Sequence, residues 1–226
     1  ELIHEHPSIR FHLTDSSSSP FSPGSFDTVY GRAVLEHIHQ PDQVAREAAR
    51  LLSPGGMIYL DGAPMWTCRH GHHVWVDAPS GRRYQFAAQH PFEPWEHLQY
   101  APDTMRHRLV VRGIPADDAD LIIQHVYFSD DICRHSPTKI IAAFQQIDNL
   151  EVVPVRIAVG AEPPVISEFA PIDLRTGKLI LLGRKLGSDH RRGDFERYVH
   201  AGLHLIEGQR FITNEVPPEF RLPRVT

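Results

Sequence analysis

The chain has 226 residues, of which 41% are hydrophobic and 23% are charged, and its formal net charge is −5. This length allows one domain with a sizeable core, and the acidic balance argues against a nucleic-acid partner held by a basic surface. No run approaches the roughly 20 apolar residues that cross a membrane, and two distant cysteines, Cys68 and Cys133, favour a reducing cytoplasm over a disulfide-stabilised secreted fold.

The first elements in chain order are predicted to form strands around one helix. Residues 9–13 are expected to form a strand, and a polar loop leads from it to a second strand over 28–30. Pro41 suits the first position of a helix, and the apolar residues after it recur at helical spacing. The Pro-Gly-Gly sequence at 54–56 is expected to end the helix and turn the chain into a third strand over 57–60. Short joints make this a βαβ unit of a parallel sheet.

Residues 64–135 do not fit a minimal α/β core and are interpreted as an insertion or cap. This stretch contains all three tryptophans and several histidines. A helix is expected over 116–127, with acidic residues near its N-terminus. Ser136 as N-cap and Pro137 at the first helical position then predict another helix.

The last part of the chain is predicted to complete the sheet. Residues 151–160 alternate apolar and polar side chains, which is typical of a strand with one buried face. A turn at Thr176-Gly177 leads to a strand over 178–182 that is apolar throughout. Residues 187–226 are a polar C-terminal extension, with one helix expected around 195–206.

These motifs, in this order and spacing, resemble the middle of a class I S-adenosylmethionine-dependent methyltransferase of the type 11 group. The resemblance is carried by Asp15, Pro20-Phe21, residues 25–29 and 34–38, Pro41, Glu47, residues 50–52 and the turn at 54–56. The family's N-terminal Gly-rich turn is missing, because no two glycines occur at i and i+2. The resemblance therefore covers the later part of the family fold, and the chain is expected to be a fragment of a longer protein.

The resemblance implies S-adenosylmethionine as the cofactor. Asp15 and Ser16 would face the adenine ring, since ligands of open α/β sheets bind outside the carboxyl ends of the strands. Gly31, Arg32 and Ala33 would lie along the methionine part, where glycine permits close approach. The plainer alternatives are a turn aspartate and a strand-ending glycine, and Arg32 could instead meet an acidic group of the substrate.

His37 is the candidate catalytic residue, and Glu36 beside it is assigned to the substrate side. A histidine near neutral pH can accept a proton from a hydroxyl, a phenol or an acidic carbon as the methyl group arrives. Positioning alone supplies much of the effect in methyl transfer, so a structural role for His37 is the competing interpretation.

Four residues directly after the third strand are expected to form a wall of the substrate pocket: Trp66, His72, His73 and Trp75. The competing interpretation is that they belong to the core of the insertion. The spacing C-x-H-x-H-H over residues 68–73 also contains zinc-ligand types, with Cys133 and His135 as the nearest second pair. No metal is predicted, because a dependable zinc signal needs two well-spaced pairs.

The sequence thus predicts an α/β fold with a Rossmann-like, mostly parallel sheet and an antiparallel late strand. It forms a single domain over residues 1–226 with the insertion at 64–135. The expected function is methyl transfer from S-adenosylmethionine to a small-molecule or metabolite acceptor, with no nucleic-acid or membrane partner. The alternatives are a non-catalytic methyltransferase-like binding module and a metal hydrolase centred on residues 68–73.

Overall fold

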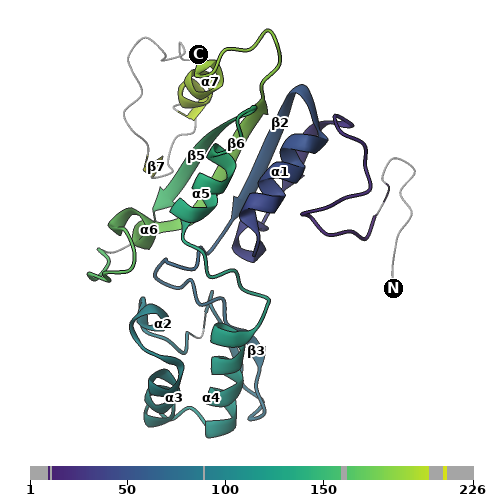
Figure 1. Cartoon of the computed structure of the whole chain (residues 1–226). Coiled ribbons are helices and arrows are strands. Elements are labelled where there is room, and N and C mark those ends of the chain that lie inside the picture. The colour runs from purple at the N-terminus through teal and green to yellow at the C-terminus, as the bar shows by residue number, and fades with distance from the viewer. Residues whose placement is uncertain (1–9, 11, 89, 159–161, 204–210, 213–226) are drawn as a thin grey trace, which may run out of the picture.

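The computed structural model of the chain describes residues 10, 12–88, 90–158, 162–203 and 211–212. These residues form a β-sheet with helices packed against it and, beside one end of the sheet, a smaller lobe built mainly of helices (Figure 1). The sheet has the strand order β1-β2-β6-β5-β7. The strands are β1 (Phe26–Gly31), β2 (Leu52–Gly62), β5 (Leu150–Ala158), β6 (Thr176–Lys185) and β7 (Phe211–Ile212).

The strand directions confirm the predicted fold class. β1 pairs with β2 in parallel, and β6 is antiparallel to both of its neighbours, β2 and β5. The strands β1, β2 and β5 therefore run in one direction, and β6 is inserted between them in the opposite direction. β7 pairs with β5 in antiparallel fashion.

Helices cover both faces of the sheet. α1 (Pro41–Leu51) and α5 (Pro137–Gln145) pack on one face, where Leu181 of β6 belongs to the main core. The next residue, Leu182, packs with the side chains of α7 (Asp194–Leu203) on the other face. This is the alternation that a strand imposes on neighbouring side chains.

The helix starts follow the sequence signals. Pro41 and Pro137 each stand in the first turn of their helix, and Ser136 Oγ accepts a hydrogen bond from the Lys139 N–H at 3.2 Å. The helix predicted around 195–206 is confirmed as α7 as far as Leu203, beyond which it lies outside the described residues.

Three local predictions are corrected. The Pro-Gly-Gly sequence at 54–56 lies inside β2, where the register jumps from Phe26 opposite Leu52 to Thr28 opposite Met57. The turn chemistry thus produces an irregularity within the strand, because the chain pairs with β1 as soon as α1 ends. The described residues of the predicted strand 9–13 carry no strand structure, and Thr176-Gly177 opens β6 rather than forming a turn.

The lobe comprises residues 64–135 and has a hydrophobic cluster of its own. Its elements are β3 (Trp75–Asp77), β4 (Arg83–Gln85), α2 (Glu96–Gln99), α3 (Pro102–Val111), α4 (Ala116–Ile123) and a π-helical turn η2 (Gln124–Phe128). The helix predicted over 116–127 is therefore confirmed as α4 with its π-helical continuation. The interpretation of the lobe as an insertion stays a prediction.

A short helix, α6 (Pro171–Arg175), joins the lobe to the sheet. Thr67 Oγ1 donates to the Asp173 carbonyl at 2.8 Å, and Trp95 Nε1 donates to the Leu174 carbonyl at 3.1 Å. The Met65 N–H donates to the carbonyl of Gly177 at the start of β6, at 2.9 Å. These bonds fix the lobe at the end of the sheet where β2 terminates.

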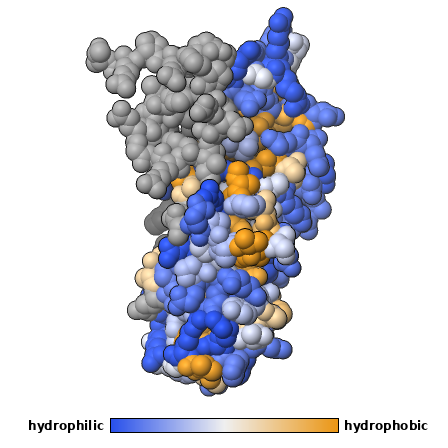
Figure 2. All heavy atoms as spheres, turned by 90° about the vertical axis from the view of Figure 1, so that its left-hand side faces the viewer, coloured by the Kyte–Doolittle hydropathy of each residue, from blue (hydrophilic) through white to orange (hydrophobic). Residues whose placement is uncertain are grey.

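Most of the described residues that are visible in Figure 2 are hydrophilic. Hydrophobic residues gather there near the middle of the molecule, surrounded by hydrophilic ones (Figure 2). Among the described helices, none has the length and apolar character to cross a membrane.

Candidate functional site

Two cavities adjoin where β1 ends: the first runs along β1 and α1, and the second lies past the carboxyl ends of β1 and β2. The first cavity has a volume of about 540 Å³ and is lined mainly by apolar side chains of β1, α1 and β2. Asp15 and Ser16 contribute to its polar rim, and Gly31, Ala33 and His37 line it where β1 ends. Parallel strands commonly bind ligands at this edge of a sheet.

The second cavity has a volume of about 720 Å³ and lies between the sheet and the lobe. The sheet side contributes Ala33, Glu36 and His37, and the lobe contributes His73 and Trp75. Ala33 and His37 line both cavities, so the two spaces adjoin at these residues.

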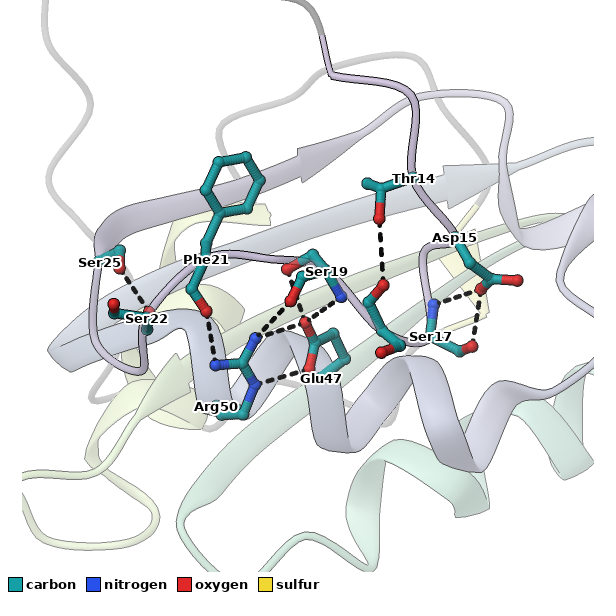
Figure 3. A network of polar contacts seen from close by, with 10 residues as sticks. Thr14, Asp15, Ser17, Ser19, Phe21, Ser22, Ser25, Glu47 and Arg50 are labelled. Atoms are coloured by element: carbon teal, nitrogen blue, oxygen red, sulfur yellow. Dashed lines mark hydrogen bonds and ion pairs between the residues drawn. The ribbon is translucent and has the colours of Figure 1, made fainter.

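A polar network fixes the loop that forms the rim of the first cavity (Figure 3). Glu47 of α1 accepts hydrogen bonds from the Ser19 N–H at 2.8 Å and from Arg50 Nε at 2.7 Å. Arg50 Nη1 donates in turn to the Phe21 carbonyl at 2.7 Å. The hydrogen bonds from Arg50 outweigh burial and lower the pKa of Glu47 to about 2. The carboxylate is therefore ionised at neutral pH and ties the loop to the helix.

Asp15 stands in this loop as the predicted adenine-side residue. Its Oδ1 accepts hydrogen bonds from the N–H and the hydroxyl of Ser17, each at 2.7 Å, and these bonds lower its pKa. The side chain is exposed at the rim of the first cavity. The turn fixes its direction and leaves it accessible to a ligand.

Replacing Glu47 with alanine is expected to free this loop. A hydrogen bond to a charged group contributes about 1.5–3 kcal/mol, so hydrogen exchange of the Ser19 amide should become about 10- to 100-fold faster. The measurement is amide exchange followed by NMR or mass spectrometry. Asp42→Ala, which removes an exposed carboxylate from the same helix, is the control and should leave the rate unchanged. Equal protection in both variants would show that Glu47 does not hold the loop.

Asp61, at the end of β2, shapes the junction of the two cavities. Its Oδ1 accepts from the Ala33 N–H at 2.7 Å, and its Oδ2 accepts from Lys178 Nζ at 2.7 Å. Ala33 has a φ of 53°, in the left-handed region that residues with a side chain rarely adopt. Burial alone would raise the pKa of Asp61, but the hydrogen bonds from Lys178 and Ala33 lower it. The ionised carboxylate therefore holds the turn that follows β1.

Three titratable side chains face one another in the second cavity. Glu36 is 3% exposed, and burial raises its pKa. The rings of His37 and His73 lie 5.6 Å apart between their centroids, in an edge-on arrangement. Burial lowers the pKa of His73 to about 4, so its ring is neutral at pH 7.

The hydrogen bonds of His37 define which nitrogen is available for chemistry. Its Nδ1 lies 2.5 Å from the carbonyl oxygen of Asp131, and a carbonyl can only accept. Nδ1 therefore carries the hydrogen in this contact, and a neutral ring keeps its lone pair on Nε2. The exposed ring stands at the junction of the cavities, where an accepted proton can leave to solvent.

The structure brings most of the predicted site residues together. Asp15, Ser16, Gly31, Ala33 and His37 line the first cavity, while Glu36, His73 and Trp75 line the second. Whether these residues bind cofactor or substrate stays a prediction.

Three of the predicted site residues line neither cavity. Arg32 is exposed, and Trp66 and His72 are buried in the lobe. The lobe packs Trp66 against His97 with ring centroids 4.8 Å apart, and His72 against Phe92 at the same distance. Their burial favours the core interpretation that the sequence left open.

The zinc arrangement considered from the sequence is not assembled. Among the described residues, two groups have metal-ligand spacing: His70 with His72 and His90, and His73 with Glu36 and His37. The three histidines of the motif are thus divided between the two groups, and Cys68 belongs to neither. Cys68 is buried, which raises the pKa of its thiol to about 11 and keeps it protonated at neutral pH.

Sequence reasoning missed several residues of the site. Asp61 directly follows the strand predicted over 57–60, and an acidic residue at that edge of a sheet is a recognisable signal. His125, which lines the second cavity, lies near the end of the lobe. No pattern in the sequence indicated it, because its position depends on how the lobe docks against the sheet.

The N-terminal part of the chain is similar in sequence to known proteins. Residues 1–60 match the family model described as a methyltransferase domain. The ubiquinone biosynthesis O-methyltransferase of Xanthomonas euvesicatoria is 50% identical over 38 residues, which are 17% of this chain and 16% of that protein. Methyltransferase GfsG of Streptomyces halstedii is 36% identical over 52 residues, which are 23% of this chain and 19% of that protein. The matched segments thus span less than a fifth of these relatives.

Solved structures show a looser similarity. An S-adenosylmethionine-dependent methyltransferase from Mesorhizobium loti aligns with a TM-score of 0.39 and 15% identity, over 76% of this chain and 68% of that one. One from Methanosarcina mazei aligns with a TM-score of 0.38 and 15% identity, over 78% and 66%. The likeness to the methyltransferase domain family therefore rests on the sequence match over residues 1–60.

Proposed function

We propose that the chain takes part in methyl transfer from S-adenosylmethionine to a small-molecule acceptor. The observation that carries this proposal is the pair of adjoining cavities that share Ala33 and His37. A two-substrate transfer needs two neighbouring binding spaces that open onto each other, and the reacting atoms must meet where the spaces join.

The residues of the first cavity fit the cofactor in size and chemistry. Its volume of about 540 Å³ lies within the range of small-molecule pockets, roughly 300–1,000 Å³. The apolar walls suit the flat adenine ring, and the Asp15 carboxylate can accept from its exocyclic amine. The backbone at Gly31 and Ala33 would line the methionine part. Bound there, the cofactor supplies an electrophilic methyl group on a sulfonium.

The chain's own contribution is position and proton acceptance. The second cavity would hold the acceptor between Trp75 of the lobe and Glu36 of the sheet. His37 stands at the junction with Nε2 available, so it is placed to take a proton from the acceptor. The lobe lies over this end of the sheet and would hold the acceptor beside the junction.

The test of this proposal is cofactor binding by calorimetry. We expect S-adenosylmethionine to bind the chain, and Asp15→Ala to weaken binding about 10- to 100-fold through loss of a charged hydrogen bond. Asp42→Ala makes the same charge change on the exposed face of α1 and should leave affinity unchanged.

A version of the chain extended upstream is titrated beside it. Stronger binding by the longer chain would show that preceding sequence adds contacts to the cofactor, in keeping with the absence of a G-x-G turn from residues 1–226. Absence of binding in both would favour the alternative, a methyltransferase-like module that binds a partner without catalysis.

A further inference from the structure

The second cavity contains a cluster of side chains that the proposed function uses only in part. Glu36, His37 and His73 each offer one ligand atom, and these three atoms lie within 4.8 Å of one another. One carboxylate and two imidazoles are a common ligand set for divalent first-row transition metals, which leaves further coordination positions open. We propose that Glu36, His37 and His73 bind such an ion, with its open positions directed into the second cavity.

The hydrogen bonds around the two histidines support ligation. His37 Nδ1 lies 2.5 Å from the Asp131 carbonyl oxygen, and His73 Nδ1 lies 3.3 Å from that of Gly71. Metal-binding histidines typically donate their second ring N–H to such an oxygen, which fixes the ring and leaves the other nitrogen for the metal. Both rings therefore present Nε2 as the available ligand atom.

The burial of Glu36 supports the same conclusion independently. Its Oε2 is buried without a hydrogen-bond partner among the described residues, and none of the ion pairs found in that part of the chain includes it. Burial outweighs the backbone hydrogen bonds that Glu36 and Ala63 provide to this carboxyl group, and a bound cation would supply the interaction that Oε2 lacks. Gly62 makes room for this side chain, since a Cβ there would lie 2.4 Å from Glu36 Oε2.

The backbone at the cluster is also held in an unusual conformation. His73 has a φ of 51°, in the left-handed region, and Ala33 on the opposite wall has a φ of 53°. Left-handed residues with side chains cost energy and gather at functional sites. At residue 73 the chain also changes surroundings: His73 lines the second cavity, whereas its neighbour His72 is buried in the core of the lobe.

The geometry requires only a small contraction on binding. Metal–ligand bonds of about 2.0–2.2 Å place neighbouring ligand atoms roughly 3–3.5 Å apart, so the three groups need to approach by about 1–2 Å. His37 is exposed and can make this movement by rotation of its side chain. The proposal of a metal site is independent of the proposed function. If the chain does transfer methyl groups, the ion would bind an oxygen of the acceptor and lower the pKa of that oxygen, in place of a general base.

The test is titration of the metal-free chain with Zn²⁺ by calorimetry, in the absence of any cofactor. We expect one equivalent to bind at this cluster and expect Glu36→Gln and His73→Gln each to weaken it about 100-fold or more, since loss of even an outer-shell partner costs 10- to 100-fold. Glu36→Gln keeps the shape of a neutral carboxyl group, so its fold is expected to survive, and circular dichroism checks this. Mg²⁺, which prefers oxygen ligands, should bind far more weakly.

His90→Gln is the matched control, because His90 belongs to the other histidine group. Loss of the ion in His90→Gln but not in Glu36→Gln, or no binding by the wild-type chain, would overturn the proposal. Substitution with Co²⁺ adds a spectroscopic readout. We expect a spectrum of nitrogen and oxygen ligation, whereas a thiolate charge-transfer band would show ligation by Cys68 or Cys133 and overturn the assignment.

Discussion

Replacing Asp173 with alanine is expected to lower the free energy of unfolding by about 3–5 kcal/mol, because it leaves a buried charge without its partner. Asp173 Oδ1 accepts from Arg156 Nη1 at 2.8 Å and from the N–H of Thr138 at 3.0 Å. The side chains of Arg156 and Asp173 are only 11% and 4% exposed. Removal of the carboxylate would strand the guanidinium in a site with little access to water.

Urea unfolding followed by circular dichroism measures this loss, and a double variant identifies its cause. Removing both partners of a buried pair costs less than removing one. Arg156→Met combined with Asp173→Ala should therefore be less destabilised than the sum of the two single variants. Asp173→Asn keeps an acceptor and provides a milder variant if the alanine form does not fold. If the free energy of unfolding of the alanine variant falls by less than about 1 kcal/mol, the Arg156–Asp173 ion pair stabilises the protein no more than a solvent-exposed pair does.

This network also positions the second cavity. Asp173 lies in α6, whose backbone accepts hydrogen bonds from Thr67 and Trp95 of the lobe. Weakening α6 should therefore let the lobe move relative to the sheet. His73 and Trp75 face Glu36 only while the lobe is docked on the sheet. The geometry of the second cavity therefore depends on the contact between the lobe and α6.

Sequence patterns predicted the elements whose side chains repeat regularly. α1 and α5 carry an apolar face after a proline in the first turn, and β5 alternates along its length, so local periodicity sufficed. α3 carries only two buried residues, Met105 and Leu109, and no pattern distinguished it from a loop. α6 is five residues long, too short for periodicity to indicate it.

The site was predictable to a similar extent. Gly31 ends β1 and His37 follows it, so topology alone places these two residues at one edge of the sheet, whereas the strand that was expected to position Asp15 is not observed among the described residues. The approach of His73 to Glu36 was not predictable, because it depends on tertiary packing between the lobe and the sheet. The left-handed backbone of His73 has no sequence signal either, since glycine is the residue that usually marks such a position.

The stability of the chain should fall in mild acid because of His97 in α2. Its side chain is 2% exposed, and Nε2 donates to the Trp66 carbonyl at 2.8 Å. Its Nδ1 is buried without a partner among the described residues, so a second proton would have no acceptor. Burial lowers the pKa of His97 to about 4 from the ordinary value of 6.5.

The direction of the effect follows from proton binding in the two states. Below about pH 6.5 the unfolded chain takes up a proton at this histidine, whereas the folded chain does so only near pH 4. The free energy of unfolding should therefore decrease as pH falls through this window, by about 1.4 kcal/mol per pH unit and roughly 3 kcal/mol in total. Above pH 6.5 both states are neutral at this residue, and its contribution does not change with pH.

Urea unfolding of the wild type and His97→Gln between pH 7.5 and 4.5 isolates this contribution from that of the other buried histidines. Glutamine keeps a donor for the Trp66 carbonyl but does not titrate. The variant should be the less stable protein at pH 7.5, and the difference should narrow by roughly 3 kcal/mol as pH falls toward 4. Parallel curves would mean that His97 takes up its proton equally well in the folded state. Water would then reach the core of the lobe around His97 in the folded state.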